Sequence, residues 1–368
     1  MPRTIEEMTR HVWEGKWLED FYVLKQCPLC GEKWTFRFYG NYGIWECINC
    51  KGNGDYHHLI NKLPQDAKYE NLFSDMEQPE DADGLIDVSL YKPPAQGKRI
   101  SSGFIELDRI TGGFTEGMLS ILTGKQGEGK STFSGLLALN AIDAGHKVCA
   151  YSGELNSAIF KKWIYGQAAG AKHTEESVDQ FGTVRYEVSK FADAKISQWL
   201  RRKLFLYDNT AHKSSEVNSI IERFTIARRQ HECDLFIVDN LMTAKMPTNN
   251  NSDFFRAQSN FVGELIDFAQ SERVHVILVA HPKKEDTGDL NDNVGGNGDI
   301  TRRSSIVMTM RRIPDEQYQK FNCNNILYVS KNREHGTTGK IDFNFDKSSK
   351  RLYLTTDRAP KMYGWERM

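Results

Sequence analysis

The chain has 368 residues, of which 39% are apolar and 26% charged, and its formal net charge is −1. This length suits one large domain with a small one. The near-neutral charge argues against a surface covered with basic side chains that bind nucleic acid, although it is compatible with a local basic path. No apolar run approaches the ~20 residues that cross a bilayer, and the N-terminus has neither a secretory signal nor a transit peptide, so we expect a cytoplasmic protein without a membrane partner.

Two cysteine pairs near the N-terminus predict a metal site. Each pair has the form C-x-x-C, and sixteen residues separate them. This spacing is typical of two knuckles that place four thiolates around one tetrahedral Zn²⁺. Because no position is left for water, the site is predicted to be structural, within a small β zinc ribbon over residues 1–60. The four ligands are Cys27, Cys30, Cys47 and Cys50. The other three cysteines, Cys149, Cys233 and Cys323, are predicted to be packing residues.

Aromatic residues between the two cysteine pairs have two interpretations. Trp34, Phe36, Arg37, Phe38 and Tyr39 offer rings and a cation, as a base-stacking platform does. They could equally form a small aromatic core for the ribbon. The sequence leaves both interpretations open.

Residues 61–97 differ in composition from what precedes and follows. They contain eight acidic residues against three lysines, and four prolines. We interpret them as a linker with one short helix at 69–76.

From residue 98 to residue 368, apolar runs alternate with helical patterns, which predicts an α/β domain with a mostly parallel sheet. One helix is expected at 217–227, behind a cap at Ser214 and Ser215. Residues 249–251 and 287–297 are rich in Gly, Asn and Asp and are predicted to be loops. The expected strands are 118–123, 147–152, 204–207, 235–239, 275–280, 305–310 and 326–330.

Residues 124–131 match the phosphate-binding pattern G-x-x-x-x-G-K-S in full. The motif follows an apolar strand and precedes a helix, as this chemistry requires, because backbone amides at a helix N-terminus attract phosphate. Lys130 is expected to contact the β- and γ-phosphates, and the Ser131 hydroxyl to ligate Mg²⁺. The residues expected to bind ATP or another NTP are Gly124, Lys125, Gln126, Gly127, Glu128, Gly129, Lys130, Ser131 and Thr132.

Three polar residues after later strands are candidates for hydrolysis. Asp239 ends an apolar strand and is the expected second Mg²⁺-holding group. Glu154 follows the strand ending at 152, which we expect to lie next to the phosphate-loop strand, so its carboxylate could activate water. His281 ends another strand and could sense the γ-phosphate, although a structural role is an equal alternative.

Lys331 and Arg333 follow the last expected strand. A cation at this place would suit a finger that reaches the nucleotide of a neighbouring subunit, and such fingers contribute roughly 10³–10⁵ in rate. The alternative is a solvated basic turn.

These residues carry a family resemblance over residues 99–360. The region resembles the DnaB-like replicative helicases, and most closely the branch with Twinkle and the phage primase-helicases, which implies a RecA-like motor. The resemblance rests on the lead-in at 102–108 and 111–114, on Asp239-Asn240-Leu241, on residues 275–285, and on Lys331-x-Arg333 followed by Gly336 and Gly339.

The resemblance implies roles and partners. Glu154 would be the base, His281 the γ-phosphate sensor, and Lys331 and Arg333 would act across a subunit interface. The family forms rings, usually hexamers, that hydrolyse ATP and translocate 5′–3′ on single-stranded DNA. Loops at 243–254 and 283–303 would line the channel. The expected DNA contacts are Lys283, Lys284, Gly296, Asn297, Gly298, Arg302 and Arg303.

The ribbon has a resemblance of its own. Residues 47–55 with Leu59 and Ile60 look like the end of a primase zinc-binding domain, yet no primase catalytic domain separates it from the motor. Primer synthesis by this chain alone is therefore not expected, and a separate primase or polymerase is a candidate partner. The expected setting is a bacterial or phage-infected cell.

Two other functions remain open. A RadA-like recombination or branch-migration ATPase also joins a four-cysteine ribbon to a RecA motor. A non-motor nucleotide switch or loader would lack the ring interface.

Overall fold

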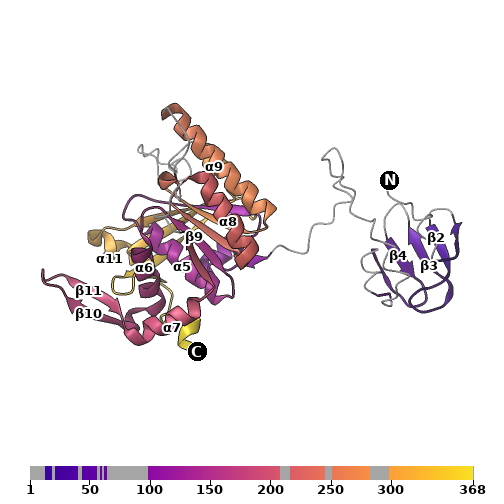
Figure 1. Ribbon diagram of the computed structural model, residues 1–368, viewed down its shortest axis with the longest axis horizontal. Helices are drawn as coiled ribbons and strands as arrows, with labels where there is room; N and C mark the ends of the chain where they lie inside the picture. Colours follow the sequence, from indigo (N-terminus) through magenta and orange to yellow (C-terminus); the bar gives the residue numbers. More distant parts are fainter. Residues whose placement is uncertain are drawn as a thin grey trace. The chain divides into compact units, whose positions relative to one another are not determined.

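The structure, a computed structural model, describes residues 13–18, 21–39, 44–55, 59, 62–63, 98–207, 216–244, 251–281 and 298–367. The chain divides into two compact units, Met1–Gln96 and Gly97–Met368 (Figure 1). The second unit begins next to the predicted boundary at residue 98. The predicted linker helix at 69–76 lies outside the described residues. In the part of the chain that the structure describes, no helix has the length and apolar character of a membrane span.

The first unit contains an antiparallel five-stranded sheet whose strands follow chain order. Phe36 and Phe38 lie in its core, and Phe36 stacks on Trp45 with ring centroids 5.0 Å apart. The stacking-platform interpretation is therefore wrong for Phe36 and Phe38, whose rings build the small core. Trp34, in contrast, is 46% exposed. The strands are β1 (Gly15–Leu18), β2 (Phe21–Gln26), β3 (Lys33–Tyr39), β4 (Ile44–Cys47) and β5 (Asn53–Asp55).

The second unit is built on a nine-stranded sheet in the order β12-β9-β13-β14-β8-β15-β16-β17-β18. The first six strands are parallel, and the last three extend the sheet with antiparallel pairing. The strands are β8 (Met118–Thr123), β9 (Val148–Ser152), β12 (Leu204–Tyr207), β13 (Leu235–Asp239), β14 (His275–Ala280), β15 (Ile306–Arg312), β16 (Asn325–Asn332), β17 (Gly339–Asp346) and β18 (Arg351–Leu354).

Helices cover both faces of this sheet. Consecutive residues of a strand point to opposite faces, so each central strand packs against both helical layers. In β13, Ile237 packs with one helical layer, whereas Phe236 and Val238 pack with the other. The first layer holds α4 (Ile105–Thr111), α5 (Lys130–Asp143), α6 (Ser157–Ala169) and α7 (Lys190–Leu200). The second holds α8 (Val217–His231), α9 (Asn251–Ser271) and α10 (Gly298–Arg303). This is the mixed α/β fold, with a mostly parallel sheet, that the sequence predicts.

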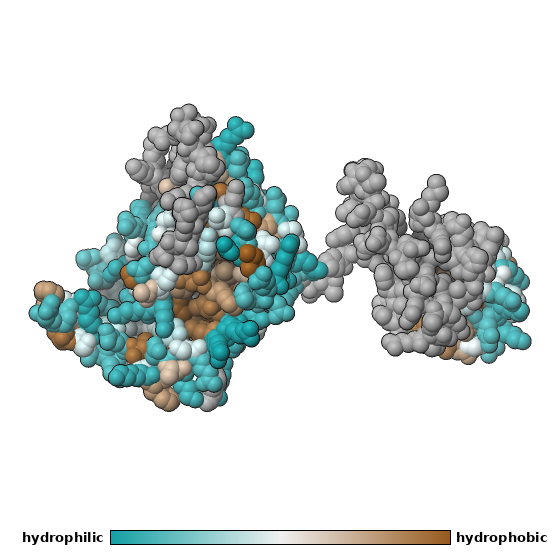
Figure 2. All heavy atoms as spheres, viewed as in Figure 1, coloured by the Kyte–Doolittle hydropathy of each residue, from teal (hydrophilic) through white to brown (hydrophobic). Residues whose placement is uncertain are grey.

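Short elements connect and flank these layers. A hairpin of β10 and β11 projects from the body, and the Asp179 carboxylate fixes its turn by accepting backbone hydrogen bonds from Phe181 and Thr183. Phe181 in this turn is 80% exposed. Figure 2 shows hydrophobic spheres on the part of the surface that projects furthest to the left. The short elements are β6 (Arg99–Ile100), β7 (Phe114–Thr115), η2 (Ala171–His173), β10 (Thr174–Val178), β11 (Val184–Val188), η3 (Leu241–Thr243), η4 (Asp315–Gln317), α11 (Tyr318–Phe321) and η5 (Gly364–Arg367).

Several local predictions differ from the structure. Helix α8 has Glu216 at its N-cap, without a side-chain cap, while the predicted cap at Ser214 and Ser215 lies outside the described residues. Asn251, predicted to be in a loop, begins α9. The predicted loop at 287–297 lies outside the described residues. Cys149, Cys233 and Cys323 are buried, which confirms them as packing residues.

Candidate active site and candidate metal centre

The candidate catalytic residues lie at the carboxyl ends of neighbouring parallel strands. Glu154 follows β9, Asp239 ends β13, His281 follows β14 and the phosphate loop follows β8. The sequence-based expectation that β9 lies next to β8 is wrong, because β13 and β14 separate them. The residues still converge, since the carboxyl ends of parallel strands share one edge of the sheet.

The phosphate loop has the conformation that its glycines allow. Gly124, Gly127 and Gly129 all have positive φ angles, of 148°, 81° and 94°. At Gly124, a Cβ atom would also lie 2.4 Å from the Met310 carbonyl oxygen. A side chain at residue 124 is therefore excluded by both backbone conformation and space.

Lys130 begins α5 and folds over the loop. Its ammonium group donates to the carbonyl oxygens of Gly124, at 2.6 Å, and Lys125, at 2.9 Å. Burial lowers the pKa of Lys130, while the nearby charges of Asp239 and Glu128 raise it. The Glu128 carboxylate also accepts the backbone N–H of Lys125, so both side chains brace the loop.

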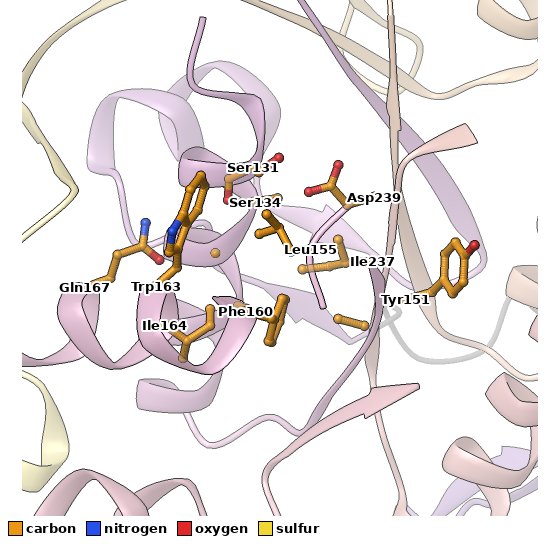
Figure 3. A pocket seen from close by; sticks show the side chains of 13 residues that line it. Ser131, Ser134, Tyr151, Leu155, Phe160, Trp163, Ile164, Gln167, Ile237 and Asp239 are labelled. Atoms are coloured by element: carbon orange, nitrogen blue, oxygen red, sulfur yellow. Dashed lines mark hydrogen bonds between the residues drawn. The ribbon is translucent and has the colours of Figure 1, made fainter. Parts of the chain in front are cut away.

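Asp239 and Ser131 suit a magnesium ion. Figure 3 shows their side chains pointing toward each other at the rim of a pocket that Phe160 and Trp163 of α6 help to line. Asp239 is only 6% exposed, and its Oδ1 atom has no hydrogen-bond partner. Burial raises the pKa of Asp239 to about 6, which hydrogen bonding with Ser131 opposes. A buried, unpaired carboxylate oxygen beside a hydroxyl is a donor set that fits Mg²⁺.

Glu154 and His281 are joined through Asn240, a residue for which the sequence alone predicted no role. The Asn240 side-chain amide donates to Glu154 Oε1 and lies 3.0 Å from His281 Nε2. His281 Nε2 lies 3.3 Å from the same Glu154 oxygen. The signal for Asn240 was its place at the start of a turn with Thr243 three residues later, the pattern of an N-cap.

Lys331 and Arg333 lie far from the phosphate loop of their own chain. Arg333 N–H bonds to Ser305 O, and Ser305 N–H bonds to Leu119 O, which places Arg333 level with the beginning of β8. The loop begins at the other end of β8, about 16 Å along the strand at ~3.3 Å per residue. Lys331 Nζ donates to the carbonyl oxygens of Thr301, at 2.5 Å, and Arg302, at 3.0 Å.

Both cations thus contact the C-terminal carbonyls of α10, where positive charge is favourable. Arg333 also donates to Arg302 O. Burial, and secondarily the charge of Arg333, lowers the pKa of Lys331 to about 8. The following turn is fastened by Glu334, which accepts hydrogen bonds from Arg99 and, at 2.8 Å, from the Thr115 hydroxyl. No local pattern in the sequence pointed to Glu334.

The predicted DNA-contacting residues are only partly described. Lys283, Lys284, Gly296 and Asn297 lie outside the described residues. The predicted loop at 283–303 is wrong from Gly298 onward, because Gly298 begins α10. Arg302 and Arg303, the other two expected cations, are both exposed at the end of this helix.

The four N-terminal cysteines form a candidate zinc centre. The sulfur atoms of Cys27, Cys30, Cys47 and Cys50 all lie within 4.8 Å of one another, and none forms a disulfide. Cys30 Sγ and Cys47 Sγ are 3.8 Å apart, which is the separation of about 3.8 Å that tetrahedral Zn–S bonds of ~2.3 Å give. The backbone N–H of Leu29 donates to Cys27 Sγ at 3.4 Å, as a thiolate ligand favours. The arrangement fits Zn²⁺.

Comparison with known proteins identifies the family of the second unit. The family model described as the DnaB-like helicase C terminal domain matches residues 99–353. The replicative DNA helicase DnaB of Mycoplasma pneumoniae is 23% identical over 276 residues, covering 70% of this chain and 57% of that protein. DnaB of Mycoplasma genitalium is 23% identical over 266 residues, covering 67% and 54%. The chain thus spans about half the length of these relatives.

Solved structures agree in fold. The ATPase domain of G40P superposes with a TM-score of 0.57 at 18% identity, covering 70% of this chain and 92% of that one. A DnaB-like replicative helicase, studied with its primase interactions, gives a TM-score of 0.56 at 17% identity, covering 73% and 68%. The family match extends over more than half of the chain, from β6 to β18. The chain therefore belongs to the family of the DnaB-like helicase C-terminal domain.

Proposed function

We propose that this protein is an ATP-driven replicative DNA helicase that translocates on single-stranded DNA as a ring, with NTP hydrolysed between neighbouring subunits. The observation that carries this proposal is the division of the catalytic groups within one chain. The phosphate loop, Asp239, Glu154 and His281 share one edge of the sheet, whereas Arg333 lies level with the opposite end of β8. A second copy would be needed to bring Arg333 to the nucleotide.

In this mechanism ATP is the substrate, and a Mg²⁺ ion held by Ser131 and Asp239 would offset the charge that develops on the transferred phosphoryl group. The loop amides and Lys130 bind the phosphates. Glu154 accepts the proton of the attacking water. Arg333 and Lys331 of the adjacent subunit stabilise the transition state, and His281 responds to loss of the γ-phosphate.

Single-stranded DNA would pass through the ring beside the segments after Thr243 and His281, with contacts mainly to phosphates. We propose a hexamer moving 5′–3′, and a cytoplasmic, phage-related setting. The zinc ribbon, which only residues 61–97 separate from the motor in the sequence, would contact template DNA or a separate primase. Its Cys₄ arrangement supports a structural role for the metal.

The test measures ATP turnover with and without single-stranded DNA, together with unwinding of a forked duplex, for the wild type and Arg333→Ala. We expect DNA-stimulated turnover and unwinding in the wild type only. Equal, DNA-independent turnover in both proteins would refute the helicase ring. Strong stimulation by a D-loop with weak fork unwinding would support the RadA-like alternative instead.

A further inference from the structure

Asn240 occupies the space between the candidate base and the candidate sensor. It is 1% exposed, and its side-chain amide group donates to Glu154 Oε1 while lying 3.0 Å from His281 Nε2. Glu154 itself is 45% exposed along its side chain, so packing alone does not fix its position. The hydrogen bond from Asn240 therefore fixes one of the two carboxylate oxygens that could accept a proton from water.

The other end of the same side chain fixes a turn. Asn240 Oδ1 accepts the backbone N–H groups of Met242, at 2.9 Å, and Thr243, at 3.2 Å. The Thr243 hydroxyl donates in return to the Asn240 carbonyl at 2.8 Å. One amide side chain thus joins the turn η3 to the carboxylate of Glu154.

The turn also packs directly on the segment that carries Glu154. A Cβ atom at Gly153 would lie 1.9 Å from Thr243 Oγ1, so only glycine allows this approach. The Gly153 N–H donates to the Asp239 carbonyl at 2.7 Å. A displacement of η3 must therefore move either Asn240 or the backbone next to Glu154.

The turn leads into the segment from Thr243 onward that the proposed function assigns to DNA. We propose that Asn240 is a positioning residue that restrains Glu154 in a resting position, and that movement of η3 on DNA binding releases this carboxylate to act as the base. This inference rests on the proposed function, because it assigns a means of regulation to the same site. It explains how DNA in the channel could control hydrolysis without touching the nucleotide.

Asn240→Ser separates the two roles of this side chain. Serine is a good N-cap, so η3 keeps its cap, but the shorter side chain cannot reach Glu154. We expect ATP turnover without DNA to rise about tenfold, the factor implied by losing one hydrogen bond to a charged group. The KM for ATP and the turnover at saturating DNA should stay unchanged, so stimulation by DNA falls by the same factor.

Two further variants separate release of Glu154 from a general loosening of the turn. Tyr151→Phe removes the Tyr151 hydroxyl's 3.3 Å hydrogen bond to the Thr243 carbonyl without touching Glu154, and it should leave turnover without DNA unchanged. Asn240→Ser combined with Glu154→Gln should lose the added turnover. If Asn240→Ser does not fold, as judged by circular dichroism, Asn240→Asp keeps the acceptor of the cap, removes the donor and should also raise turnover.

The outcomes distinguish failure of this inference from failure of the proposed function. Unchanged or lower turnover without DNA in Asn240→Ser would overturn the restraint, whatever DNA does. An equal rise in Asn240→Ser combined with Glu154→Gln would also overturn it, because the added turnover would then not depend on the Glu154 carboxylate. A wild type with turnover that DNA does not stimulate would refute the helicase function, while the comparison without DNA would still decide whether Asn240 restrains Glu154.

Discussion

Replacing Asp239 with asparagine is expected to stabilise the ligand-free second unit while abolishing its response to Mg²⁺ and ATP. The carboxylate is buried, and Oδ1 has no partner. Its charge is therefore unfavourable until a cation arrives. Asparagine has nearly the same shape and carries no charge, so the variant should lose the unfavourable charge together with the metal site.

The pKa of Asp239 sets the magnitude. Folding raises it from the ordinary value of 3.8 to about 6. This difference of about 2 units corresponds to about 3 kcal/mol at ~1.4 kcal/mol per unit. Because the folded carboxyl group binds its proton more tightly, protonation stabilises the fold fully below pH 3.8, and this contribution is lost as pH rises through about 6. Asp239→Asn should therefore be more stable by about 3 kcal/mol at pH 8 and by about half of that at pH 5.

Urea unfolding at both pH values measures the free energy of unfolding, with Asp315→Asn as the control. Asp315 is exposed, so its replacement should change stability by less than about 0.5 kcal/mol. MgATP should raise the melting temperature of the wild type and the control, but not that of Asp239→Asn. The reasoning is refuted if Asp239→Asn is no more stable than the wild type at pH 8, or if its advantage is the same at both pH values.

Three other predictions concern the subunit interface, the zinc centre and the core. Arg333→Ala should lower DNA-stimulated ATP turnover by roughly 10³-fold or more with ATP affinity retained; near-normal turnover would contradict a role in catalysis. Purified protein should contain one zinc ion by mass spectrometry, which Cys30→Ser loses and Cys323→Ala retains; zinc retained in both would contradict the Cys₄ site. Phe236→Ala should reduce the free energy of unfolding in urea by about 3–5 kcal/mol, because the Phe236 ring is buried. Phe181, by contrast, is exposed, so Phe181→Ala should change this free energy by less than about 0.5 kcal/mol.

The central strands were predictable because burial on both faces demands uninterrupted apolar residues. The predicted ranges for β12, β13 and β14 coincide with those observed. The strands β17 and β18 were not predicted, because charged residues interrupt their apolar runs, such as Lys340 and Asp342 in β17 and Arg351 in β18. Strand β17 pairs with β16 and β18 pairs with β17, and no short window of sequence reveals this pairing.

The site was predictable residue by residue, but its connections were not. A motif identifies Lys130 and Ser131 because phosphate binding needs a fixed local spacing. The order of the strands, which separates Glu154 from the phosphate loop by β13 and β14, depends on crossover connections. The role of Asn240 depends on two other strands ending beside it, so it became visible only in three dimensions.

If Arg333 completes the site of a neighbouring chain as proposed, its placement at the opposite end of β8 from the phosphate loop would also determine how many working centres an assembly contains. Under the proposed arrangement, each chain supplies one half of each of two centres. A closed ring of n chains then has n complete centres, an open array has one fewer, and an isolated chain has none. Specific activity should rise with protein concentration until rings close, so that dilution alone would switch the enzyme off.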